Sequence, residues 1–205
     1  MIGRKLNEIT MTKEVQDAVE EFNVPGGWDE KSAAVKAFKD ELKQKLLDNQ
    51  DYKCAYCGLP LKTRNPEIDH IAPKGGASRP KYPQFSFLTL NLVYACHNCN
   101  SPECKGQTDV VELKSDENYR NWTFKLVHPY LDDPNDFFEC NNAGDIIVLP
   151  KKDASECNKK KARYTIDMFN LDSEAKLMEM AKQIQFERQP EEIKRIVIDI
   201  STYKE

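Results

Sequence analysis

Two short stretches of the sequence decide the fold: Cys54-Ala55-Tyr56-Cys57 (CAYC) and Cys96-His97-Asn98-Cys99 (CHNC). Each is a C-x-x-C pair, which places two sulfur atoms on one side of a tight turn, and 38 residues separate the pairs. Together they offer the four sulfur ligands of a tetrahedral zinc site. Because four protein ligands fill the coordination shell, we expect this Zn²⁺ to be structural and to supply folding energy.

Other interpretations of the cysteines stay open at this point. His97 and Cys104 lie near enough in the sequence to replace one zinc ligand. The two pairs could also be unrelated buried thiols, or the first pair a redox motif, although a second C-x-x-C pair favours chelation. Cys140 and Cys157 belong to no such motif, and we expect both to be buried thiols.

The composition is that of an ordinary globular protein of 205 residues, with 40% hydrophobic and 31% charged residues. No apolar run approaches the ~18 residues of a membrane span, and the N-terminal residues lack the apolar core of a secretory signal. We therefore expect a cytoplasmic protein, in which seven cysteines favour metal binding over disulfides. The net charge is −4, but residues 53–107 carry seven Lys/Arg against three Asp/Glu, so this part can present positive charge to phosphates.

Hydrophobic periodicity divides the chain into three parts. An N-terminal helical region covers residues 1–50, with helices expected at 12–22 and 30–49 and Asp29 as the N-cap of the second. The central part, residues 51–110, has short segments separated by proline and glycine. The C-terminal part, residues 111–205, is expected to form a small sheet followed by helices. Its expected strands are 122–128 and 144–149, and its expected helices are 159–170, 173–188 and 190–203.

The central part also contains the stretch EIDHIAPKGG, residues 67–76, which raises the question of what His70 does. A histidine between two isoleucines is more often structural than catalytic. Three features favour a functional role here: Asp69 precedes it, a basic Pro-Lys-Gly-Gly loop follows it, and the cysteine pairs bracket it. In a strand, Asp69 and His70 would point to opposite faces, so either they have different roles or the backbone bends. We expect His128, beside Pro129, to be structural.

The order Asp69-His70, then Asn91, then Asn100, threaded between two C-x-x-C pairs, resembles the HNH nucleases with a ββα-metal core. The resemblance covers residues 54–105 and implies an α+β fold, in which a zinc-stapled ββα-metal unit lies between N-terminal and C-terminal helices. It also implies that Asp69 and Asn100 bind a catalytic Mg²⁺ or Mn²⁺ and that His70 is the general base. Asn91 would hold the His70 ring through its side-chain amide or through the loop that it anchors. The strict motif has His at position 100, but an amide oxygen is a hard ligand suited to Mg²⁺.

These residue types also suit the chemistry of phosphodiester hydrolysis. The reaction needs an activated water and a cation that neutralises the developing charge on the phosphate. A neutral imidazole can accept the proton of the water near pH 7. Basic side chains near the candidate site are expected to contact backbone phosphates: Lys74, Arg79, Lys81 and Lys105.

A second resemblance is carried by residues 127–134 (VHPYLDDP), the Phe137-Phe138 pair, the Gly144-Asp145 turn and residues 164–171. These segments are similar to those of the Septu-type (PtuB-like) and retron-associated HNH proteins. The resemblance implies the effector nuclease of a bacterial anti-phage system, acting on nucleic acid, with DNA favoured over RNA. It also implies an ATPase partner or a non-coding nucleic acid that restrains the nuclease. The alternative is a zinc-knuckle nucleic-acid-binding or adaptor protein without catalysis.

Overall fold

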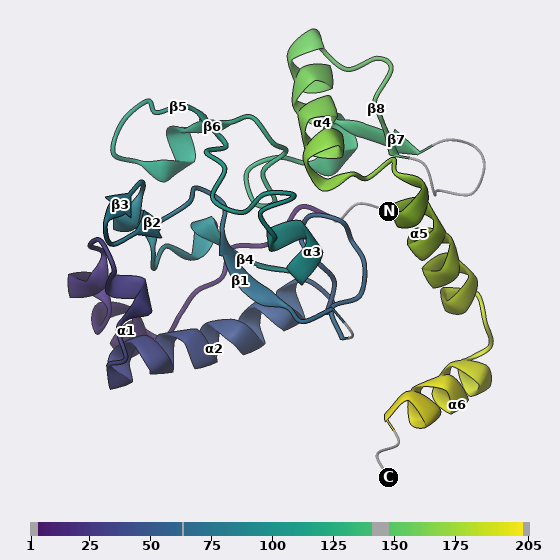
Figure 1. Ribbon diagram of the computed structural model, residues 1–205, viewed down its shortest axis with the longest axis horizontal. Helices are drawn as coiled ribbons and strands as arrows, with labels where there is room; N and C mark the ends of the chain where they lie inside the picture. The colour runs from purple at the N-terminus through teal and green to yellow at the C-terminus, as the bar shows by residue number, and fades with distance from the viewer. Residues whose placement is uncertain (1–3, 63, 141–147, 203–205) are drawn as a thin grey trace.

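The computed structural model describes residues 4–62, 64–140 and 148–202, which form α-helices and short antiparallel strand pairs (Figure 1). The helices are α1 (Lys13–Asp17), α2 (Ala33–Asn49), α3 (His97–Asn100), α4 (Glu156–Phe169), α5 (Glu174–Glu187) and α6 (Glu191–Thr202). The strands are β1 (Glu67–His70), β2 (Gly75–Gly76), β3 (Arg79–Pro80), β4 (Leu92–Ala95), β5 (Val111–Leu113), β6 (Thr123–Phe124), β7 (Phe138–Cys140) and β8 (Val148–Pro150). The mixed α+β class predicted from the sequence is confirmed.

The central part forms a β-β-α unit in chain order. Strand β1 pairs antiparallel with β4, with Glu67 opposite Ala95 and His70 opposite Leu92, and α3 follows directly after β4. Cys96, which precedes α3, has an extended backbone and so ends the strand and begins the helix. Figure 1 shows this unit between α2 on one side and the C-terminal helices on the other.

Helix α2 forms one wall of the core because its apolar residues recur every three or four positions. The buried members of this stripe are Val35, Phe38, Leu42 and Leu46. The predicted N-cap was wrong: the Ser32 hydroxyl, not Asp29, accepts a hydrogen bond from the Val35 amide at 3.2 Å. Asp29 lies in the preceding turn and pairs instead with Lys74 at 2.8 Å. The first predicted helix is also shorter than expected, since α1 ends at Asp17.

The C-terminal part departs from its predicted strands. β6 covers two residues of the predicted strand 122–128. The Lys125 amide still donates to the Val110 carbonyl, but Thr165 accepts from the Val127 amide and Asp132 from the His128 amide, so side chains replace strand pairing there. The strand expected at 144–149 is seen as β8 from Val148, and the Gly144-Asp145 turn lies outside the described residues. Helix α4 begins earlier than predicted, because the Ser155 hydroxyl accepts from the Asn158 amide at 3.1 Å.

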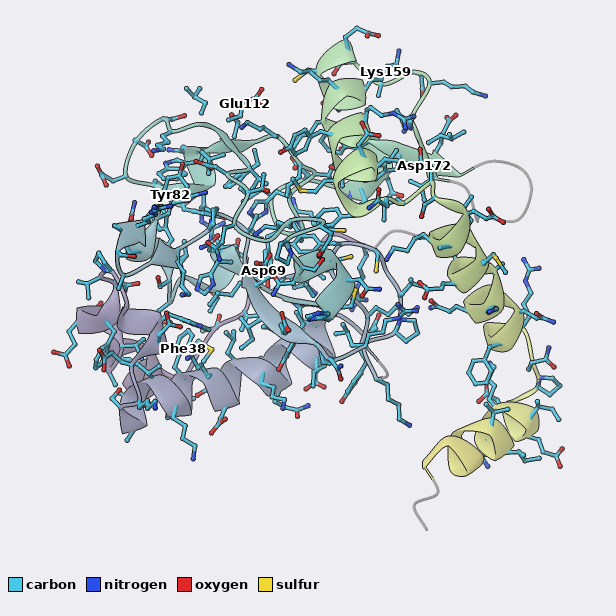
Figure 2. All side chains as sticks on the ribbon, in the orientation of Figure 1. Phe38, Asp69, Tyr82, Glu112, Lys159 and Asp172 are labelled. Atoms are coloured by element: carbon cyan, nitrogen blue, oxygen red, sulfur yellow. The ribbon has the colours of Figure 1, made fainter. Side chains whose placement is uncertain are left out.

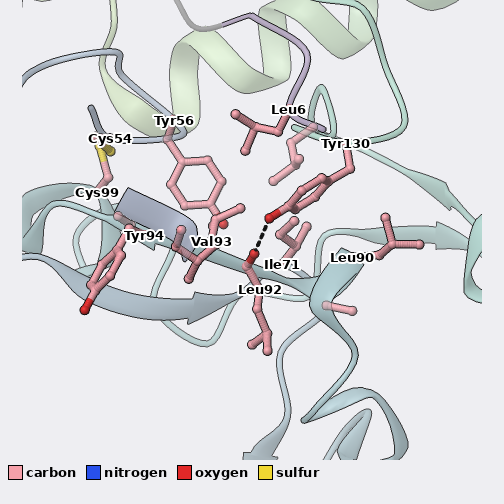
Figure 3. Close-up of a cluster of buried hydrophobic side chains, with 14 of the residues drawn as sticks. Leu6, Cys54, Tyr56, Ile71, Leu90, Leu92, Val93, Tyr94, Cys99 and Tyr130 are labelled. Atoms are coloured by element: carbon pink, nitrogen blue, oxygen red, sulfur yellow. Dashed lines mark hydrogen bonds between the residues drawn. The ribbon is translucent and has the colours of Figure 1, made fainter. Parts of the chain in front are cut away.

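Buried hydrogen bonds join the C-terminal part to the central unit. The Tyr130 hydroxyl donates to the Leu92 carbonyl in β4 at 2.8 Å, as Figure 3 shows. His128 is fully buried beside it, and its Nδ1 accepts from the amides of Tyr130 and Leu131. The prediction that His128 is structural is therefore confirmed. Helix α5 packs on the main core through Met180, whereas Figure 1 shows α6 apart from the rest of the molecule. No described helix is long and apolar enough to cross a membrane.

The N-cap of α2 can be tested with two single substitutions. Ser32→Ala removes the acceptor for the Val35 amide, so the free energy of unfolding should fall by about 1 kcal/mol. Asp29→Ala removes an ion pair whose carboxylate is largely exposed, so the change should stay within about 0.5 kcal/mol. Urea unfolding followed by circular dichroism measures both. An equal or larger loss in Asp29→Ala would mean that the cap is misassigned.

Candidate functional site

The four cysteines of the two C-x-x-C pairs form one buried cluster. All four sulfur atoms lie within 4.8 Å of one another, and the sulfurs of Cys57 and Cys96 are 3.9 Å apart. Tetrahedral zinc with Zn–S bonds of ~2.3 Å requires sulfurs about 3.8 Å apart, so the cluster could hold a zinc ion. The Cys96 amide points at the Cys54 sulfur at 3.3 Å, an arrangement that stabilises a thiolate ligand.

Local backbone structure explains why the first pair forms a tight turn. Gly58, which follows Cys57, has a φ of +68°, a conformation that glycine adopts without strain. Its amide donates to the Cys54 carbonyl at 2.9 Å, and the Cys54 amide donates to the Leu59 carbonyl at 2.9 Å. This turn directs the sulfurs of the first pair inward, toward the second pair.

The other cysteine interpretations fare differently. His97 is exposed, and its Nδ1 lies 3.0 Å from Glu67, while Cys104 contacts the Asn170 amide, so neither belongs to the sulfur cluster. Because all four clustered sulfurs are buried together, the redox interpretation is disfavoured, since reactive thiols need access. Cys157 is exposed, so the prediction that it is buried was wrong. The side chain of Cys140 lies outside the described residues.

His70 lies at the end of β1, in a closed aromatic environment. The residue is 6% exposed, and its ring meets the edge of Trp28 with the centroids 4.6 Å apart. Nε2 lies 3.1 Å from the Ser86 carbonyl oxygen. A carbonyl can only accept, so Nε2 carries the hydrogen and Nδ1 keeps the lone pair. Burial lowers the pKa of His70 to about 3, so the ring is neutral at pH 7.

Asp69, labelled in Figure 2, precedes His70 in β1 and is also buried; neighbouring strand residues point to opposite faces. The Tyr56 hydroxyl donates to its Oδ2 at 2.5 Å. The Lys105 ammonium lies 2.9 Å from Oδ2 and 3.1 Å from Oδ1, and it also donates to the His70 carbonyl at 2.7 Å. Lys105 is fully buried, so the prediction that it contacts backbone phosphates was wrong. The sequence pattern had no signal for this, because long-range pairing decides which lysine is buried.

Asn91 is fully buried and uses its whole side-chain amide. Its oxygen accepts from the Ala72 amide at 2.7 Å and from the Tyr119 hydroxyl at 2.8 Å. Its nitrogen donates to the carbonyls of Ala72 and Phe85, both at 3.1 Å. Asn91 thus ties the backbone that follows His70 to the backbone next to Ser86, whose carbonyl holds the His70 ring. It anchors the loops rather than touching the ring.

Asn100 has a different partner from the one expected. Its side-chain amide donates to Glu67 Oε2 at 2.6 Å, while Glu67 Oε1 lies 3.0 Å from His97. Among the described residues no hydrogen bond joins Asn100 to Asp69, and their shared role as ligands of a catalytic cation stays a prediction. The sequence reasoning missed Glu67. Its position two residues before Asp69 was a usable signal, because alternate strand residues share a face.

The remaining predicted phosphate contacts lie on the segment after His70. Lys74 pairs with Asp29, and the Lys81 ammonium donates to the Gln107 carbonyl. Arg79 is exposed in β3. Their contact with nucleic acid stays a prediction.

Two named proteins are similar to part of the chain, whereas no family model matches it. Protein ea31 of Escherichia phage lambda is 34% identical over 87 residues, which cover 42% of this chain and 24% of ea31. The CRISPR-associated endonuclease Cas9 of Corynebacterium diphtheriae is 36% identical over 69 residues, which cover 34% of this chain and 6% of Cas9. The matched segment is therefore a small part of both relatives.

Zinc binding by the cysteine cluster predicts a difference between two cysteine substitutions. Cys99→Ser removes one buried sulfur ligand, so the protein should lose bound zinc and more than about 3 kcal/mol of unfolding free energy. Cys157→Ser, at an exposed position, should change neither. Elemental analysis and urea unfolding measure both. Wild-type zinc content and stability in Cys99→Ser would contradict a four-sulfur site.

Burial of His70 predicts a pH dependence of stability. Its folded pKa of about 3 lies below the ordinary value of 6.5, so the unfolded chain binds the extra proton between these values. Stability should therefore fall as the pH drops from about 6.5 toward 3. His70→Gln should flatten this slope by up to about 1.4 kcal/mol per pH unit.

The matched control for this slope is His97→Gln. Glu67 raises the pKa of the exposed His97, so this histidine favours the folded state at low pH, and its removal should not flatten the slope. Urea unfolding at a series of pH values gives all three curves. An unchanged slope in His70→Gln would mean that the ring is hydrated in solution.

Proposed function

We propose that this protein is a metal-dependent HNH-type endonuclease that hydrolyses phosphodiester bonds of nucleic acid, with DNA the favoured substrate. One observation carries the proposal: a histidine at the end of the first strand of a β-β-α unit has one ring nitrogen fixed by a carbonyl and its other nitrogen without a partner among the described residues. The partial similarity to a Cas9 endonuclease supports it.

His70 would act as the general base through Nδ1. The Ser86 carbonyl fixes the tautomer, and Asn91 holds the neighbouring backbone, so the lone pair is oriented before substrate arrives. At a pKa of about 3 the buried ring is a weak base, so the site must open for reaction. A substrate phosphate brings negative charge, which stabilises the imidazolium form and raises the pKa toward the range that general-base catalysis needs.

Asp69 offers limited room for a catalytic Mg²⁺ or Mn²⁺. A carboxylate has about four acceptor positions, and Tyr56 and Lys105 occupy three of those on Asp69, which leaves one on Oδ1. Asn100 donates its amide nitrogen to Glu67, and its amide oxygen would be the second ligand. When bound, a divalent cation supplies charge neutralisation for the phosphate. The Lys105 ammonium would have to leave Asp69 before the cation could use more than one acceptor position of this carboxylate.

We assign the protein to bacterial anti-phage defence on its resemblance to the Septu-type and retron-associated proteins, with an ATPase as the partner that restrains it. The exposed apolar side chains Ile193, Ile196 and Val197 on α6 give such a partner a surface to cover.

Buried residues favour a second candidate function, that of a non-catalytic zinc-knuckle binding module. His70 and Asp69 are each only 6% exposed, and the Asp69–Lys105 pair is closed, as structural groups would be.

A plasmid nicking assay separates the two candidates. Zinc-loaded wild type should nick supercoiled DNA with Mg²⁺ or Mn²⁺ and not with EDTA. His70→Ala and Asn100→Ala should each lose at least about 100-fold in rate, since each removes a group used in the transition state. Asn98→Ala, an exposed asparagine of the same short helix, should cleave like wild type.

Two results would contradict the nuclease proposal. One is equal cleavage by wild type and His70→Ala. The other is a folded wild type that binds DNA but cleaves neither DNA nor RNA with either cation, alone or with an ATPase partner. The second result would favour the binding module.

A further inference from the structure

The first turns of α5 lie against the cysteine cluster. Lys176 in α5 is 8% exposed, and Met180, one helical turn later, is buried in the main core. Glu179, on the same side of the helix, pairs with Arg64 at 3.1 Å. Arg64 belongs to the loop between the two cysteine pairs, and its carbonyl accepts from the His97 amide at 3.1 Å. Helix α5 is thus fixed to the segment that carries the sulfur ligands.

The chain just before α5 packs on the same cluster. The Phe169 ring, at the end of α4, stacks on the Tyr56 ring with centroids 4.4 Å apart and planes 13° apart. Tyr56 lies inside the first C-x-x-C pair. The next residue, Asn170, contacts the Cys104 sulfur at 3.8 Å. Phe169 and Asn170 therefore place the α4–α5 junction beside the first C-x-x-C pair and Cys104.

This packing also brings positive charge to the buried sulfurs. Four thiolates around one Zn²⁺ form a dianion, and a buried dianion is costly unless positive charge lies near it. Burial by itself would lower the pKa of Lys176, but the negative charge of the four cysteines outweighs it, and the pKa lies above its usual value. Burial acts on Arg64 in the same direction, and Glu179 and the thiolates of Cys57 and Cys96 outweigh it, so its pKa is also raised. Geometry agrees: Lys176 lies one turn before Met180, which packs in the same buried core as the four cysteines, and Arg64 pairs with Glu179 of the same helix.

We propose that Lys176 and Arg64 are the counter-charges of the zinc centre, so that zinc retention and docking of helix α5 are two sides of one coupled equilibrium. The proposal rests on the cysteine cluster holding zinc and does not depend on nuclease activity. Such coupling is reciprocal. If zinc loss lowers the docking equilibrium constant of α5 by some factor, then undocking of α5 lowers the zinc affinity by the same factor. The zinc centre then holds the C-terminal helices as well as the β-β-α unit.

Zinc release to a chromogenic chelator tests the charge. Full-length zinc-loaded Lys176→Met keeps the length of the side chain but removes its charge, so zinc should leave at least about tenfold faster than from wild type. Lys176→Arg should restore slow release. Lys182→Met, an exposed lysine of the same helix, should match wild type. Wild-type release from Lys176→Met would overturn the proposal.

A second pair of variants tests docking without changing charge, and it remains informative if Lys176→Met does not fold. Met180→Ala removes a buried contact of α5, so it should speed zinc release and raise amide hydrogen exchange in residues 174–187 together. Met178→Ala, which is 53% exposed, should do neither. Faster hydrogen exchange in Met180→Ala with unchanged zinc release would show that docking and zinc retention are independent, and would overturn the coupling.

Discussion

The convergence of four buried sulfurs is the constraint on which the rest of this structure depends. It draws together two segments separated by 38 residues and so pins both ends of the chain that forms β1 and β4. Those strands are four residues long, and a hairpin of that size is marginal in water without further support. The cluster supplies the support, and Tyr56 between the first two sulfurs reaches from it to Asp69. The cysteine cluster and the candidate site are therefore built from the same short segments.

Around this cluster, buried polar groups form hydrogen bonds and ion pairs with one another and with the backbone. Asn91 makes four side-chain hydrogen bonds, Lys105 neutralises Asp69, and the Ser86 carbonyl holds His70. Such networks fix a unique arrangement, because an unpaired member would cost the full desolvation penalty. Because these groups bond to one another, the site is closed to substrate in this arrangement. A nuclease built on it must exchange some of these contacts for substrate and cation, and the Asp69–Lys105 pair is the contact that holds the predicted cation ligand closed.

Part of this arrangement could be read from the sequence, because it depends on local spacing. The C-x-x-C pairs and the amphipathic stripe of α2 are properties of neighbouring residues, whereas the order of strand, strand and helix came from the resemblance. What the sequence missed is which groups meet across the fold. Nothing local distinguishes buried Lys105 from exposed Arg79, and the β1–α3 packing gives Asn100 an unpredicted partner, Glu67. The N-cap of α2 was misassigned because Asp29 and Ser32 are both suitable residue types, and only the fold shows that Ser32 accepts from the Val35 amide while Asp29 pairs with Lys74.

The ligand set of the zinc centre is the quantity on which the whole account depends, and X-ray absorption at the zinc edge measures it directly. Protein purified without added metal should contain one zinc per chain, with four sulfur neighbours at ~2.3 Å and no light-atom neighbour in the first shell. Three sulfurs and one nitrogen would place His97 in the site and contradict the cluster described here. Absence of zinc from a stably folded protein would contradict the metal as the source of its stability.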